Sequence, residues 1–171
     1  MSDRKITVSG EINEENFSNF SNDLAVLERP PFRPVQLHLI SDGGDAYSAL
    51  AFYDRIMVSP CPVHVHAYGL VASAAVLILA AGAKRYMGKS SWVMVHEDHG
   101  DTSGNVSYLE IETAHLRSME NQWNDLMAKH TTIDAPGWAK LHKRTTYLSY
   151  ADCISAGLVD GPLPTPKRRA K

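Results

Sequence analysis

The stretch Gly69-Leu-Val-Ala-Ser73-Ala-Ala-Val-Leu-Ile-Leu-Ala-Ala-Gly82 decides the fold, because it sets a serine at the head of the most apolar segment of the chain. The apolar run from Leu70 to Ala81 is too short to span a bilayer and predicts a helix buried inside the protein, closed by Gly82. A serine in this place most often caps the helix. Unpaired N–H groups and the positive end of the helix dipole would also favour a developing oxyanion there. Ser73 is therefore either a helix cap or a nucleophile.

A second strand-to-helix junction lies upstream, at Ser41-Asp42-Gly43-Gly44. Residues 35–39 alternate between apolar and polar, which predicts a strand, and a helix is expected over 46–57. The four residues between them predict a sharp turn. Paired glycines at the carboxyl end of a strand let the backbone approach a ligand closely, although a plain tight turn is the simpler interpretation.

A nucleophilic serine needs a base, and the chain has eight histidines. His96 ends the apolar strand predicted over 92–96, and α/β active sites gather at the carboxyl ends of strands. His99 is the nearest alternative. His64 and His66 lie on the polar face of a strand predicted over 63–67, where we expect them at the surface. No third ligand accompanies them, so no metal site is predicted.

Strands and helices alternate along the chain, which predicts an α/β domain with parallel strands and crossover helices. The longest helix is expected over 108–129, with Ser107 and Glu110 as its capping box. Its apolar stripe either packs on its own domain or forms a subunit contact, and it consists of Leu109, Leu116, Met119, Trp123 and Leu126. The other predicted elements are strands at 5–8 and 85–87, a helix at 14–27, and short helices opened by Asp134 with Pro136 and by Ser149 with Asp152, the latter closed by Gly157.

The composition suits one domain, which we place at residues 1–163, followed by a basic flexible tail at 164–171. The net charge of −2 gives no reason to expect a nucleic acid or a membrane as partner. Cys61 and Cys153 match neither a metal spacing nor a disulfide framework, which indicates a reducing compartment. With no apolar leader at its start, the chain is expected in the cytoplasm.

Five motifs, in this order and at this spacing, resemble the proteolytic subunit of the Clp protease (ClpP): Gly43-Gly44, Gly69-x-x-x-Ser73, Met94-Val-His96, Tyr147-Leu-Ser149 and Gly157-Leu-Val-Asp160. The similarity runs from about Ile6 to Leu163. The resemblance implies the ClpP/crotonase-type α/β spiral of ββα units with a protruding handle helix. It also implies a serine endopeptidase with Ser73 as nucleophile, His96 as general base, and the N–H groups of Gly44 and Ala74 as oxyanion hole.

The resemblance further implies a homo-oligomer, a heptameric ring or double ring, which takes peptides or unfolded proteins and needs no cofactor. Residues 100–106 would form the handle strand that pairs with extended peptide, and the helix from Tyr108 would join two rings. The axial loops with which the family engages a Clp-type ATPase precede the first strand. Only about four residues do so here, so ATPase docking is not a firm expectation.

Three positions depart from the family pattern. The family's third catalytic residue is an aspartate two positions before the aromatic residue of its Phe-Leu-Ser motif, and Thr145 stands there. A threonine hydroxyl can accept a hydrogen bond from an imidazole but supplies no negative charge. In a model Ser-His-Asp protease, replacing the aspartate with its amide costs about 10⁴-fold in rate. Ala74 replaces a methionine, and Asp42 replaces a proline beside the expected oxyanion hole.

Thr145 therefore also supports a second hypothesis, a non-catalytic ClpR-like subunit that serves assembly or regulation. An acyl-CoA enzyme of the related crotonase fold is a third, weaker hypothesis, because it needs no Ser-His pair. The carboxylates nearest to His96 in sequence are Glu97, Asp98 and Asp101, and nothing in the sequence directs any of them to its ring.

Overall fold

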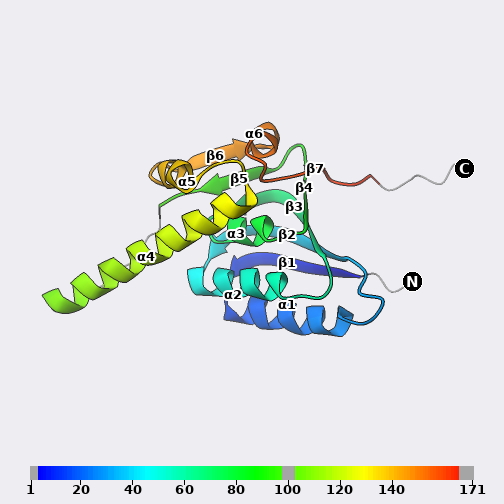
Figure 1. Ribbon diagram of the computed structural model, residues 1–171, viewed down its shortest axis with the longest axis horizontal. Helices are drawn as coiled ribbons and strands as arrows, with labels where there is room; N and C mark the ends of the chain where they lie inside the picture. The colour runs from blue at the N-terminus through cyan, green and yellow to red at the C-terminus, as the bar shows by residue number, and fades with distance from the viewer. Residues whose placement is uncertain (1–3, 98–102, 166–171) are drawn as a thin grey trace, which may run out of the picture.

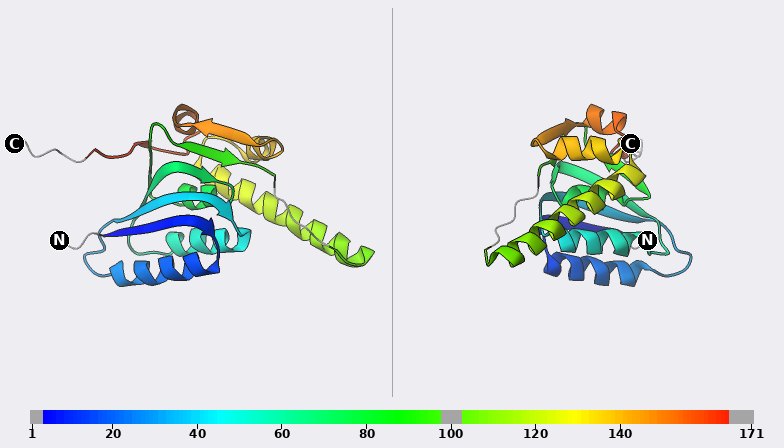
Figure 2. Two further views of the ribbon diagram at one scale, coloured as in Figure 1. Left: turned by 180° about the vertical axis from the view of Figure 1, so that it is seen from behind. Right: turned by 60° about the vertical axis from the view of Figure 1, so that its left-hand side comes forward.

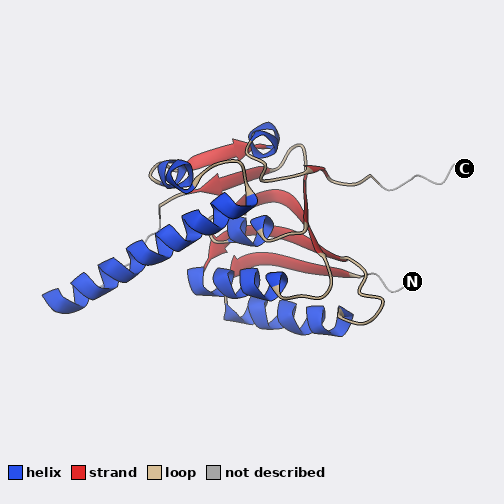
Figure 3. Cartoon of the chain, viewed as in Figure 1, coloured by secondary structure: helices blue, strands red, loops and turns tan. Residues whose placement is uncertain are grey.

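The computed structural model describes residues 4–97 and 103–165, and within them strands and helices alternate around one sheet of seven strands (Figures 1 and 3). Five parallel strands follow one another across this sheet in the order β1 (Lys5–Ile12), β2 (Val35–Gly44), β3 (Val63–Ala72), β4 (Lys84–Met87) and β7 (Gly161–Pro162). The predicted α/β class with parallel strands is confirmed.

The long strand β3 divides the sheet into two branches. Its first half pairs with β4, from His64–Lys84 to Ala67–Met87. Its second half pairs with β5 (Trp92–Val95), from Leu70–Trp92 to Ala72–Met94. The strand β6 (Thr146–Ser149) then pairs with β5 in the antiparallel sense. The second branch therefore brings the carboxyl ends of β3 and β5 side by side.

Three helices cover one face of the sheet: α1 (Glu14–Leu27), α2 (Ala46–Met57) and α3 (Ala75–Ala80) (Figure 2). The apolar side chains of β2 and β3 turn toward these helices, and Leu37, Leu39 and Val65 are fully buried. All six residues of α3 are buried, which makes it the centre of the core. Burial of this apolar surface supplies the main driving force for the fold.

The helix α4 (Val106–His130) extends well beyond the body of the protein, and only its carboxyl-terminal half packs onto it (Figure 1). Its buried residues, Asn124, Leu126 and Met127, all lie in that half. The predicted capping box is wrong by two residues: the Asn105 side chain accepts the N–H of Tyr108 and starts the helix. Asparagine is as good a cap as serine, so the helix begins at the earlier signal.

Two short helices complete the fold, α5 (Ala135–His142) and α6 (Tyr150–Ser155). The Asp134 side chain caps α5, and Ser149 with Asp152 forms the predicted capping box of α6. Among the described residues, no helix is both long and apolar enough to cross a membrane.

Three local predictions are wrong. Leu70 to Ala72 belong to β3 rather than to the apolar helix, which begins only at Ala75. The expected sharp turn at 41–44 is the end of β2, and its glycines take positive φ values within an extended segment. His66 is buried rather than at the surface, because its ring packs among His38 and Tyr86 and its Nε2 atom donates to the Gln36 side-chain oxygen at 2.6 Å.

Candidate active site

Ser73 is the elbow between β3 and α3. Its φ of 53° lies in the left-handed region, which a residue with a side chain adopts only at a cost of about 1–3 kcal/mol. Its own N–H donates to the Met94 carbonyl oxygen at 2.8 Å and fastens the elbow to β5. A strained residue that the surrounding structure holds in place is typical of a functional position.

The two glycines at the end of β2 make room for this elbow. A Cβ atom on Gly43 would lie 2.6 Å from the Ser73 Cβ and 3.2 Å from its Oγ, so a side chain there would displace the serine. A Cβ atom on Gly44 would lie 2.3 Å from the Ile12 carbonyl oxygen. The sequence Gly43-Gly44 therefore serves a close approach of backbones, as the paired glycines suggested, and not a turn.

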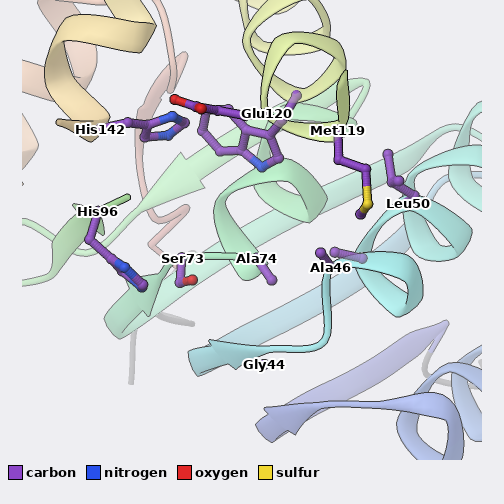
Figure 4. Close-up of a pocket in the computed structure, with 11 residues that line it drawn as sticks. Gly44, Ala46, Leu50, Ser73, Ala74, His96, Met119, Glu120 and His142 are labelled. Carbon is purple, nitrogen blue, oxygen red and sulfur yellow. The ribbon is translucent and has the colours of Figure 1, made fainter. Parts of the chain in front are cut away.

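His96 follows the last residue of β5, two residues after the pairing of Ala72 with Met94. In Figure 4 the His96 ring extends toward Ser73, whose hydroxyl oxygen is drawn on the side away from the ring. The Nδ1 atom lies 2.6 Å from the Glu97 carbonyl oxygen. Because a carbonyl oxygen only accepts, Nδ1 carries the proton, and in the neutral ring Nε2 is the basic nitrogen.

Thr145, at the expected position of the third catalytic residue, lies beside His96 in the sheet register. The antiparallel ladder of β5 and β6 ends with the pair Val95–Thr146, so Thr145 comes next on the side of His96. The Thr145 side chain is exposed and forms no hydrogen bond with another described residue. The backbone carbonyl oxygen of Glu97, and not its carboxylate, accepts the hydrogen bond from His96 Nδ1. Asp98, His99 and Asp101 lie outside the described residues, as do the first three residues of the predicted handle strand. The other four, 103–106, are described and form no strand, so this prediction is wrong there: Asn105 caps α4 and Val106 already begins it.

A pocket joins the predicted catalytic residues. Gly44, Ser73, Ala74 and His96 line it together. The N–H of Ser73 donates to the Met94 carbonyl oxygen and is therefore occupied. The next N–H along the chain belongs to Ala74, which precedes the first residue of α3, and an N–H at this end of a helix has no partner within the helix. Asp42 is exposed and does not line the pocket, so its charge is less of an obstacle than its place in the sequence suggested.

The opposite wall of the pocket comes from α2, α4 and α5, and sequence reasoning missed part of it. Met119 and Trp123 belong to the predicted apolar stripe, but Glu120 and His142 were not singled out. Burial, and secondarily the charge of His96, lowers the pKa of His142 to about 4, so this ring is neutral at pH 7. Only the packing of α4 and α5 against the elbow reveals these two residues, because no local motif marks them.

The described residues contain no cluster of three or more histidine, cysteine, aspartate or glutamate side chains that could hold a metal ion. Both cysteines are buried, and burial raises the pKa of the Cys153 thiol to about 12, which leaves it unreactive. Ser73 is thus the best candidate nucleophile in the described part of the chain.

Comparison with known proteins agrees with this architecture. The family model described as Clp protease matches residues 1–164. The proteolytic subunit 2 of the ATP-dependent Clp protease from Treponema denticola is 31% identical over 159 residues, which cover 91% of this chain and 80% of that protein. An Asn-to-Asp mutant of ClpP1 from Listeria monocytogenes superposes with a TM-score of 0.87 at 27% identity, over 95% of this chain and 92% of that chain. The resemblance and the ClpP-type fold expected from the motifs are confirmed: the chain belongs to the Clp protease family.

Proposed function

We propose that the protein is a serine endopeptidase that cleaves extended peptides or unfolded proteins. The observation that carries this proposal is the pocket that Gly44, Ser73, Ala74 and His96 line together. Family membership supports the same reaction class. The Glu97 carbonyl supports it further, because it fixes the His96 tautomer that can accept a proton at Nε2.

The reaction would follow the acyl-enzyme route. His96 Nε2 takes the hydroxyl proton of Ser73 as Oγ bonds to the peptide carbonyl carbon. The N–H groups of Gly44 and Ala74 stabilise the oxyanion. His96 then gives the proton to the leaving amine as the peptide bond breaks, and water hydrolyses the ester by the same two steps. No cofactor takes part.

Thr145 makes this enzyme a weak one in our proposal. The Glu97 carbonyl can orient the imidazole, but as a neutral dipole it stabilises the imidazolium less than a carboxylate would. The oxyanion hole and the bound geometry still contribute, since such sites retain roughly 10³–10⁴-fold acceleration without an intact triad.

The test is turnover of fluorogenic peptides by the purified chain. We expect slow cleavage that Ser73→Ala and His96→Ala each abolish while the fold, followed by circular dichroism, stays intact. Turnover that survives Ser73→Ala would come from a contaminant or from another residue, and it would refute the assignment.

We also propose that the protein assembles into heptameric rings, with α4 as the contact between two of them. The amino-terminal half of α4 buries no residue within its own chain, and Ile111 is 66% exposed there. A helix of this kind gains its stability from a partner. An ATPase partner is not part of the proposal.

A non-catalytic ClpR-like subunit is the second candidate, and Thr145 is the observation that favours it. Such a subunit would assemble with an active partner and need no nucleophile. Intact assembly with no peptide turnover, and no change on Ser73→Ala, would select this candidate over the first.

A further inference from the structure

The pocket beside Ser73 is lined mainly by apolar side chains, and two further polar side chains lie among them. Ala49 and Leu50 on α2 and Met119 and Trp123 on α4 form apolar walls, a lining suited to the methylene groups of a long side chain. Glu120 on α4 and His142 on α5 are the polar side chains that line the pocket besides Ser73 and His96. Figure 4 shows both at the same end of the pocket.

The His142 side chain is buried and packed against a neighbouring ring, but its ring nitrogens form no hydrogen bond with the described residues. The side chain is 7% exposed, and its ring packs against Trp123 with centroids 4.2 Å apart. The ring nitrogens are not among the fully buried unpartnered atoms of the described residues, so they remain accessible from the pocket, where a ligand or water can bond to them. The neutral ring has one nitrogen that accepts a hydrogen bond.

Glu120 adds a second acceptor, with a negative charge. Its side chain is partly buried and forms no ion pair or hydrogen bond within the described part of the chain. An ionised carboxylate only accepts hydrogen bonds. Among the described residues, no lysine or arginine lines the pocket. A ligand group with several N–H donors and a positive charge is the chemistry that matches both residues.

We propose that this pocket selects peptides with lysine or arginine at the residue whose carbonyl Ser73 attacks, with Glu120 and His142 as the specificity-determining residues. The inference rests on the peptidase function proposed above, because the side chain next to the attacked carbonyl must lie beside the nucleophile. The aliphatic stem packs on Met119 and Leu50, and the cationic tip reaches Glu120 and His142. An acidic side chain is repelled by Glu120.

The test compares three fluorogenic peptides that differ only at this residue, which is lysine, norleucine or glutamate. Norleucine keeps most of the apolar stem of lysine and lacks its charge. We expect kcat/KM for the lysine peptide to exceed that for the norleucine peptide about twofold to fivefold, the effect of a partly screened charge pair. The glutamate peptide is expected to be the poorest substrate.

Variants at Glu120 then assign the effect. Glu120→Gln should bring the lysine and norleucine values close together, and Glu120→Lys should make the glutamate peptide better than the lysine peptide. Such an inversion is not expected from a purely structural role. Asp125→Asn is the matched control, since Asp125 is exposed on the same helix, outside both this pocket and the projecting half of α4, and it should leave the preference unchanged.

The outcomes separate the two proposals. Cleavage of the norleucine peptide at least as fast as the lysine peptide would overturn the specificity and leave the peptidase function standing. A preference for lysine that Glu120→Gln does not reduce would overturn the role of Glu120. Failure to cleave any of the peptides, together with no labelling of Ser73 by an active-site probe, would overturn the proposed function itself.

Discussion

Thr145 is the residue on which the strength of the proposed activity depends. It follows the last pair of the β5–β6 ladder on the side of His96, so a carboxylate at this position would lie beside the imidazole. We expect Thr145→Asp to raise kcat/KM by about 10–10³-fold, because the added charge stabilises the imidazolium, an effect worth about 10⁴-fold in a model protease. Steady-state kinetics on a fluorogenic peptide measure it.

Thr145→Asn is the matched control, since asparagine has the size of aspartate without its charge. It should stay close to the unsubstituted protein. If Thr145→Asp is no faster than Thr145→Asn, the missing charge is not what limits this site.

At the residue scale, the sequence already indicated four of the pocket residues. The positions of Gly44, Ser73 and His96 suggested that they meet, because the carboxyl ends of parallel strands lie at one edge of a sheet. Ala74 and the oxyanion-hole role of Gly44 came from the resemblance to the Clp protease. Glu120 and His142 could not be predicted in the same way. They reach the pocket only through the angle at which α4 and α5 cross the elbow, and no local pattern encodes that angle.

The helix α4 is the element whose role lies outside its own chain in our account. Exposed apolar residues such as Ile111 and Val106, 66% and 71% exposed, mark its projecting half. We expect Ile111→Glu to reduce assembly to smaller species without lowering the thermal stability of the domain, because the side chain is 66% exposed and lies outside the core of the described residues. Size-exclusion chromatography with light scattering follows the mass, and circular dichroism follows the melting.

Val26→Glu is the control for this prediction. Val26 is 60% exposed on α1, away from the projecting helix, and its substitution should leave the mass unchanged. Equal masses for the Ile111→Glu variant and the unsubstituted protein would show that α4 is not a subunit contact through this face.

Helices and strands with a clear hydrophobic period could be predicted from the sequence. The boundary between β3 and α3, which depends on the backbone conformation of Ser73, could not. Strand β2 and helices α1 and α2 follow their hydrophobic periods, and β5 is a short continuous apolar run. The extent of β3 was missed at Leu70 to Ala72, because an apolar run has the same composition in a buried strand and in a buried helix. The positive φ of Ser73 separates the two elements, and a serine at that conformation has no sequence signal.

The whole molecule should lose stability in acid because of two buried histidines. Burial lowers the pKa of both His66 and His142 to about 4, assisted by nearby charges of His38 and His64 on the first and of His96 on the second. An unfolded histidine titrates near pH 6.5. Below that pH the unfolded chain binds protons that the folded chain does not, so stability falls as the pH falls from 6.5 toward 4.

At pH 5 the free energy of unfolding should be lower than at pH 7.5 by up to about 2 kcal/mol for each of these histidines. Urea titrations at both pH values measure the difference, and His66→Phe should reduce it by the share of one histidine. A free energy of unfolding that is the same at pH 5 and at pH 7.5 would contradict the burial of these two rings as neutral groups.

The most direct test of the central claim, that Ser73 is an activated nucleophile, is labelling with a fluorophosphonate probe followed by mass spectrometry of the digested protein. Our account predicts a single adduct on Ser73, which is absent from the His96→Ala protein. A folded, assembled protein in which Ser73 stays unlabelled after prolonged incubation, or in which another residue takes the probe, would contradict it.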